Sequence, residues 1–159
     1  MVEKAGNKNR QRVDSIRQLM KERGIDAYII RSDDFHGSEY VGDYFMCRRY
    51  VTGFDGSAGS VVITADEAVL WTDGRYFLQA EEQLKGTGIE LYRQGVAGVP
   101  DIPAYLSEHV GNGGFIAYDG RTVSVSFRDM IMAAFKDRHV NIIDDIDLVG
   151  MIWDDRPAM

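Results

Sequence analysis

The sequence predicts an α/β fold, in which a mixed, mostly parallel sheet carries helices on both faces. The 159 residues match the length of a single domain. From residue 68 onward, short apolar segments alternate with helical segments, which is typical of parallel strands joined by helices. A short turn lies immediately before residue 68, and an apolar segment stands on each side of it. This indicates an antiparallel pair and makes the predicted sheet mixed.

One helix and one strand are expected at the start of the chain. Residues 9–23 place apolar side chains at spacings of three and four, as an amphipathic helix does. Gly24 is suited to end this helix, because a left-handed residue commonly follows the last turn. Residues 25–30 are typical of a short buried strand. Residues 31–50 show no clean period, and we expect them to form a functional or interface-forming loop.

A hairpin and a series of alternating elements follow. Residues 60–64 and 68–72 are predicted strands, separated by a tight turn at 65–67. The next helix is entered through residues 72–74, whose side-chain oxygens can cap it. The remaining predicted helices span residues 76–84, 102–110, 125–135 and 147–153, and the remaining predicted strands span residues 89–93, 115–118 and 140–143.

Composition and charge exclude several classes of protein. The chain has 25 acidic and 18 basic residues, a net charge of −7, and its basic segment, residues 1–31, is interpreted as the solvated face of the first helix. We therefore expect no nucleic-acid partner. Cys47 is the single cysteine, which excludes an internal disulfide and suits a reducing compartment. No apolar run approaches the roughly 18 residues of a membrane span, and the first residues lack the apolar core of a secretory signal, so we expect no membrane contact and a cytoplasmic location.

The glycine-rich segment 53–59 does not fit a phosphate-binding or nucleophile motif. No Gly-Lys-Ser/Thr follows it, as in a P-loop, and it precedes a strand instead of joining a strand to a helix, as a dinucleotide-binding loop does. A nucleophile elbow around Ser57 would need glycine at the position of Asp55. We therefore expect these glycines to serve a backbone that turns tightly or approaches another chain.

A second concentration of unusual residues, 71–76, lies where a predicted strand ends. Open α/β sheets tend to bind ligands at this carboxyl edge, so Arg75 and Tyr76 could face a ligand. The alternative is a surface arginine stacked on an aromatic ring, with Asp73 acting only as a helix N-cap. The sequence leaves both interpretations open.

The potential metal ligands do not form a recognisable set. His36 can be grouped with nearby acidic residues, but no fixed spacing defines a zinc or dinuclear site. His109 and His139 lie near the ends of predicted helices, where a cation favours the helix dipole. Cys47 has no obvious base beside it. We predict no catalytic and no metal-binding residue in this chain. The late acidic residues are expected to form a solvated face, namely Asp144, Asp145, Asp147, Asp154 and Asp155.

Two long motifs resemble the N-terminal domain of Xaa-Pro aminopeptidases, the aminopeptidase P family, in its long, three-domain, cytosolic type. They are CRRYVTGFDGSAG at residues 47–59 and LWTDGRYFLQA at residues 70–80. The resemblance covers residues 10–157 and implies a creatinase-like α/β domain, with a mixed sheet and helices on both faces. We expect residues 1–9 to be a disordered or tag-like N-terminus.

The resemblance implies that the catalytic machinery lies outside this chain. In the family, a C-terminal "pita-bread" domain holds two metal ions, usually manganese, and their bound water attacks the bond before a proline in second position. We expect no cofactor in this chain and no catalysis by it alone, because the second and catalytic domains are absent from it. Its implied partners are its own C-terminal domains, a second copy in a full-length homodimer, and a peptide with proline in second position.

The residues of the two matched motifs are also candidates for a surface that controls substrate access or forms a subunit contact. An arginine fork can grip a carboxylate, and aromatic side chains provide rigid contact area. The candidate residues are Arg48, Arg49, Phe54, Asp55, Asp73, Arg75 and Tyr76.

Two other functions compete with this interpretation. The chain could be a non-catalytic, peptidase-like interaction module, of the kind found in histone chaperones, whose arginines Arg48, Arg49 and Arg75 bind a protein partner. It could also be a nuclease of ribonuclease H-like topology with Asp55 and Asp73 as metal ligands, but the net charge of −7 opposes this. Metal ligands downstream in a longer parent protein would favour the peptidase over the interaction module.

Overall fold

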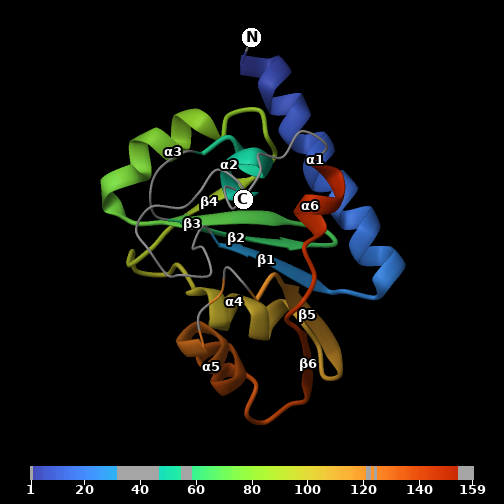
Figure 1. The fold of residues 1–159 in the computed structure, drawn as a ribbon. Helices are drawn as coiled ribbons and strands as arrows, with labels where there is room; N and C mark the ends of the chain where they lie inside the picture. Colours follow the sequence, from blue (N-terminus) through green and yellow to red (C-terminus); the bar gives the residue numbers. More distant parts are fainter. Residues whose placement is uncertain (1, 32–46, 55–58, 121–122, 124, 154–159) are drawn as a thin grey trace.

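The computed structural model describes residues 2–31, 47–54, 59–120, 123 and 125–153, and it places one sheet between two layers of helices (Figure 1). The strand order is β4-β3-β2-β1-β5-β6. The strands are β1 (Ala27–Arg31), β2 (Ser60–Thr64), β3 (Ala68–Thr72), β4 (Glu90–Arg93), β5 (Gly114–Tyr118) and β6 (Val140–Ile143). The helices are α1 (Val2–Arg23), α2 (Cys47–Thr52), α3 (Phe77–Gln83), α4 (Ile102–His109), α5 (Val125–Ala134) and α6 (Leu148–Ile152), and a 3₁₀ turn, η2 (Gly74–Tyr76), precedes α3.

Strand β2 runs against the other five strands of the sheet. It pairs antiparallel with β1 and β3, whereas the β1–β5, β3–β4 and β5–β6 pairs are parallel. The predicted mixed, mostly parallel sheet and the predicted hairpin are therefore confirmed. Because Ser60 pairs with both Arg31 and Trp71, the start of β2 lies beside the ends of β1 and β3. We call the edge where β1, β3 and β4 end the carboxyl edge of the sheet.

The side chains of the central strand β1 divide the core between the two faces of the sheet. Tyr28 and Ile30 belong to a cluster with apolar residues of α1, α2, α3 and α6. Ala27 and Ile29 belong to a second cluster, with apolar residues of α4 and α5. Successive strand side chains point to opposite faces, so a strand covered on both sides must be apolar throughout. This explains why the sequence shows apolar runs here without polar alternation.

Helix α1 begins earlier than the sequence indicated. It starts at Val2 instead of residue 9, and Asn9 is only 6% exposed. The Asn9 amide donates to the backbone oxygen of Val51 at 2.8 Å, which ties α1 to α2. Asn9 is thus part of the folded domain. At the other end, Gly24 has a φ of +68°, so its predicted role as the residue after the helix is confirmed.

Helix α2 corrects the prediction of a continuous loop over residues 31–50. Cys47 and Val51 are buried in the core, and the Thr52 hydroxyl donates to the backbone oxygen of Arg48 at 2.7 Å. Helix α2 has six residues, too few to produce a periodic pattern, and tertiary packing holds it in place. The rest of the predicted loop lies outside the described residues. The other predicted elements agree with the observed ones to within two residues, except that the helix predicted from residue 76 begins as η2.

A buried tyrosine connects the central strand to the last helix. The Tyr28 hydroxyl donates to the backbone oxygen of Ile146 at 2.8 Å and accepts from the backbone N–H of Leu148 at 3.1 Å. Burial raises the pKa of Tyr28, because the phenolate would be poorly solvated, so the hydroxyl keeps the proton that it donates. Asp147 caps α6 by accepting from the N–H of Gly150 at 2.9 Å. These bonds fix α6 against β1.

Replacing Tyr28 with phenylalanine should lower the free energy of unfolding by about 1–3 kcal/mol, because it leaves two buried backbone groups without their partner. Urea denaturation followed by circular dichroism measures this change. Tyr92→Phe, on a partly exposed tyrosine of β4, is the control and should change stability little. Equal stability of Tyr28→Phe and the wild type would show that the hydroxyl does not hold α6.

Candidate functional site

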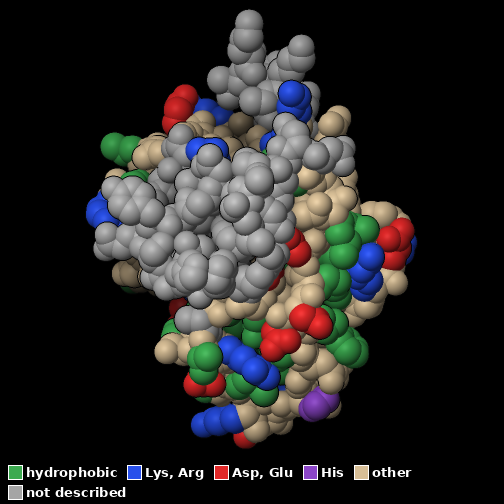
Figure 2. All heavy atoms as spheres, viewed as in Figure 1, with side chains coloured by type: hydrophobic (Ala, Val, Ile, Leu, Met, Phe, Trp, Pro, Cys, Tyr) green, Lys and Arg blue, Asp and Glu red, His purple; other side chains and the backbone are tan. Residues whose placement is uncertain are grey.

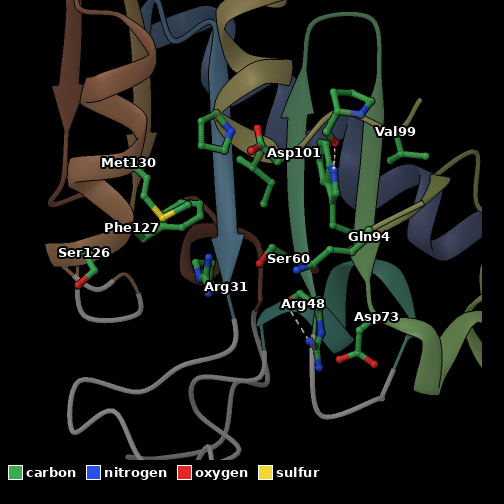
Figure 3. A pocket seen from close by; sticks show the side chains of 16 residues that line it. Arg31, Arg48, Ser60, Asp73, Gln94, Val99, Asp101, Ser126, Phe127 and Met130 are labelled. Carbon is green, nitrogen blue, oxygen red and sulfur yellow. Dashed lines mark hydrogen bonds between the residues drawn. The ribbon is translucent and has the colours of Figure 1, made fainter. Parts of the chain in front are cut away.

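A cavity of about 710 Å³ opens at the carboxyl edge of the sheet (Figure 3). Arg31 lines it from the end of β1, Ser60 from the start of β2, and Trp71 from the end of β3. The segment after β4 forms a second side, from Gln94 to the first turn of α4. The beginning of α5 forms a third side, with Ser126, Phe127 and Met130. The cavity therefore lies where the topology of an open α/β sheet tends to place a ligand.

Gly59, which lines this cavity, lies where two backbone segments approach each other closely. A Cβ atom added there would lie 3.0 Å from Arg48 Nη1 and 3.1 Å from the backbone oxygen of Trp71. Arg48 Nη1 donates to the backbone oxygen of Gly59 at 3.0 Å. Gly53, at the other end of the glycine-rich segment, has a φ of +79°. The predicted tight turn is confirmed at Gly53, and the close approach at Gly59 is to other segments of the same chain.

Asp73 and Arg75 form a two-pronged ion pair beside the cavity. Arg75 donates from Nε and Nη2 to the two carboxylate oxygens of Asp73 at 3.0 and 2.8 Å. The Arg75 backbone N–H also donates to Asp73 Oδ1, so Asp73 is the N-cap of η2. The Arg75 guanidinium lies 5.1 Å from the centre of the Tyr76 ring. These contacts match the second interpretation of this segment, in which a surface arginine stacks on an aromatic ring and Asp73 is a helix N-cap. The Arg75 side chain is 68% exposed.

The structure separates the predicted surface residues into two groups. Asp73, Arg75 and Tyr76 lie together on η2 and the residue before it, and Arg49 is exposed on α2. Arg48 and Phe54 are instead 5% and 0% exposed, which corrects their placement on a contact surface. Phe54 packs edge-on against Tyr76, with ring centres 6.0 Å apart, and supports that ring from inside. Asp55 lies outside the described residues.

Sequence reasoning missed most of the cavity. Arg31, Gln94 and Phe127 belong to none of the motifs, although each stands at the end or the beginning of a predicted element. A place at the end of a strand or the beginning of a helix could have indicated a cavity residue, because in a parallel sheet these strand ends and helix starts meet at one edge. It could not be used without the strand order, which decides which of these ends are neighbours.

The histidines and acidic residues do not gather into a metal site within the described part of the chain, where no group of three potential ligands is close enough together. His36 and the acidic residues near it lie outside the described residues. His109 is in the last turn of α4, as expected, where its Nδ1 is 2.8 Å from the backbone oxygen of Tyr105 and its Nε2 is 3.2 Å from Glu67. These residues lie near the β2–β3 turn, away from the carboxyl edge.

The surface charge is mixed on the face shown in Figure 2, where acidic and basic side chains of the described residues are interspersed. Among the helices that the structure describes, none combines the length and the hydropathy needed to cross a membrane.

Comparisons with known proteins point to one family. Residues 12–152 match the creatinase/prolidase N-terminal domain. The chain is 41% identical over 152 residues to aminopeptidase P2 of Arabidopsis thaliana, a match that covers 92% of this chain and 21% of that protein. It is 40% identical over 136 residues to the Xaa-Pro aminopeptidase ApepP of Drosophila melanogaster, covering 84% of this chain and 22% of that protein.

Solved structures share the fold. X-prolyl aminopeptidase from Caenorhabditis elegans, a cytosolic enzyme with a di-nuclear active site, matches with a TM-score of 0.84 and 31% identity, over 93% of this chain and 26% of that chain. The N-terminal domain of the cytoplasmic peptidase PepQ from Mycobacterium tuberculosis matches with a TM-score of 0.63 and 25% identity, over 90% of this chain and 98% of that chain.

Fold and sequence together define a creatinase-like α/β domain. The chain belongs to the creatinase/prolidase N-terminal domain family, and its relatives include Xaa-Pro aminopeptidases. It spans 21% and 22% of the length of the two curated relatives described above. The family resemblance predicted from the two motifs is confirmed.

The ion pair beside the cavity should be visible in the titration of Asp73. Its pKa is lowered, chiefly by the hydrogen bonds from the Arg75 side chain. Because the pKa of Asp73 is lower in the folded state than in the unfolded state, the pair stabilises the fold at pH values above the unfolded-state pKa of Asp73. This contribution is lost as the pH falls through the folded-state pKa of Asp73. Arg75→Gln should therefore raise the pKa of Asp73, measured by NMR of its carboxyl carbon.

Arg23→Gln, on an exposed arginine at the opposite end of the sheet, is the matched control and should leave the Asp73 titration unchanged. Because the pair is exposed, Arg75→Gln should change the melting temperature little. An Asp73 titration identical in the wild type and Arg75→Gln would show that the pair does not form in solution.

Proposed function

We propose that this chain is the non-catalytic N-terminal domain of a metal-dependent Xaa-Pro aminopeptidase, which removes the N-terminal residue before a proline. The observation that carries the proposal is the extent of one match, which covers 92% of this chain but only 21% of the Arabidopsis aminopeptidase. In this proposal the dinuclear metal site, with manganese as its metal, belongs to a downstream catalytic domain. The full-length protein acts in the cytoplasm as a homodimer.

The role that we propose for the domain is subunit assembly and control of substrate access, through Arg49, Asp73, Arg75 and Tyr76. Two features support this choice. The Asp73 carboxylate holds the exposed Arg75 guanidinium in one orientation, so little side-chain freedom is lost on binding. Phe54 supports the Tyr76 ring from the core side. Arginine and rigid aromatic side chains are the residue types that dominate the energy of protein interfaces.

The test compares the isolated chain with the longer protein. Arg75→Ala and Tyr76→Ala, introduced into the longer protein, should weaken dimerisation or lower kcat/KM for an Xaa-Pro peptide by roughly tenfold, as loss of an interface anchor does. Arg75→Ala should leave the melting temperature of the isolated chain nearly unchanged, whereas Tyr76→Ala should lower it, because the Tyr76 ring packs against Phe54 and the core. The wild-type isolated chain, assayed with manganese, should release no N-terminal residue above a metal-only control.

Arg23→Ala, at the opposite end of the sheet, is the control and should affect neither assembly nor kinetics. Normal assembly and kinetics in both Arg75→Ala and Tyr76→Ala would refute the proposed role of this surface. A longer protein without metal ligands in its downstream domain would instead favour the interaction module.

A further inference from the structure

The cavity at the carboxyl edge contains two uncharged polar side chains, Ser60 and Gln94, that form no hydrogen bond with the residues that the structure describes. We propose that the cavity binds an uncharged, internal segment of an extended peptide, which pairs with Gln94 and Ser60 through its backbone amides. The volume of about 710 Å³ lies within the roughly 300–1,000 Å³ usual for ligand pockets. The inference goes beyond the proposed function, because the isolated chain should bind such a segment whether or not the longer protein is an enzyme.

Ser60 is the buried member of this pair. It begins β2, where its backbone pairs with Arg31 of β1 and Trp71 of β3, and it is only 7% exposed. A buried hydroxyl without a partner has lost the hydrogen bonds that bulk water would give it, and such groups are uncommon in folded proteins. A ligand in the cavity can supply that partner, because the hydroxyl both donates and accepts.

Gln94 points toward Ser60 from the segment that follows β4 (Figure 3). The backbone holds this segment in place, because the Gln94 N–H donates to the backbone oxygen of Thr72 at 3.0 Å and Trp71 Nε1 donates to the backbone oxygen of Pro100 at 2.8 Å. A side chain on an anchored segment loses less freedom when it binds. The Gln94 amide offers a carbonyl acceptor and an NH₂ donor, which complement the N–H and the C=O of a peptide group.

The charged residues described as lining the cavity balance each other, and all of them have partners within the protein. They are Arg31, Arg48, Asp73 and Asp101. Their partners include, in the same order, the Phe127 ring, the backbone oxygen of Gly59, the Arg75 guanidinium and the backbone N–H of Ala104. A charged ligand would give up its hydration and compete with these existing contacts, which is unfavourable. The balance of charge therefore favours an uncharged ligand over an anion or a cation.

Apolar side chains line two sides of the same cavity (Figure 3). On α5, Met130 is 52% exposed, and its unbranched side chain can adapt to the shape of a ligand. On the side that follows β4, Val99 and Pro100 are partly exposed. An apolar ligand side chain that covers these residues removes apolar surface from water. Apolar walls beside groups that can pair with an amide suit one apolar residue between two peptide groups, as in the interior of a peptide.

The experiment is an NMR titration of the isotope-labelled 159-residue chain with the blocked tripeptide acetyl-Ala-Leu-Ala-amide, at neutral pH and constant ionic strength. Saturable shifts are expected at the backbone amides of Ser60 and Gly95 and at the side-chain amide of Gln94. The same tripeptide with a free C-terminal carboxylate, or with a free N-terminal amine, should bind about fivefold more weakly or worse. Acetyl-Ala-Gly-Ala-amide should also bind about fivefold more weakly, because it lacks the apolar side chain.

Variants test the assignment to Gln94 and Ser60. Gln94→Met keeps the length of the side chain but removes its amide, and it should weaken binding of the blocked tripeptide about fivefold. Ser60→Ala should also weaken it. Gln18→Met, on the exposed face of α1, is the matched control and should bind like the wild type.

The wild-type titrations test the proposal even if a variant fails to fold. Equal or tighter binding of either charged tripeptide would overturn it, as would equal binding of the glycine tripeptide. Shifts confined to other residues, or the absence of saturable shifts, would overturn it as well. Unchanged binding by a folded Gln94→Met variant would show that the Gln94 amide does not pair with the peptide.

Discussion

The central strand β1 is hydrogen-bonded on both sides, antiparallel to β2 and parallel to β5, and the arrangement of the other elements depends on these two pairings. They place Arg31 beside Ser60 and set the directions of β2 and β5, and the β2–β3, β3–β4 and β5–β6 pairings extend the sheet from these strands. As a consequence, the ends of β1, β3 and β4 meet at one edge, where the helices that follow the strands also begin. The cavity, the Asp73–Arg75 pair and the exposed part of α2 all lie there because of this one arrangement.

The segments that cover the sheet are attached by specific polar and aromatic contacts as well as by apolar packing. The Tyr28 hydroxyl fixes α6 against β1, and the Tyr50 ring stacks on Trp153 with centres 4.5 Å apart. Arg12 of α1 lies 3.8 Å from the centre of the Tyr50 ring on α2. The first helix, α2 and the end of the described chain thus form one unit on the sheet face opposite α4 and α5.

Residue patterns were sufficient to predict the fold class, most element boundaries and the family, whereas the site depended on tertiary structure. Gly24 and the hairpin could be predicted because their signals are local. Helix α2 could not, since six residues give no period and its buried Val51 depends on the core for its place. The motif containing Arg48 and Phe54 suggested a surface, but motifs do not distinguish a buried residue from an exposed one. Arg31 and Gln94 come to line one cavity only through the strand order.

Native-state hydrogen exchange tests most directly whether β1 organises the domain. Strands at the centre of a cooperative unit exchange only when the whole domain unfolds, whereas edge elements open locally at lower free energy. If β1 organises the domain, the amides of Ile29 and Ile30 in β1 exchange with the free energy of global unfolding, and those of Leu91 in β4 and Ile142 in β6 exchange faster. Slower exchange at Leu91 or Ile142 than in β1 would contradict it.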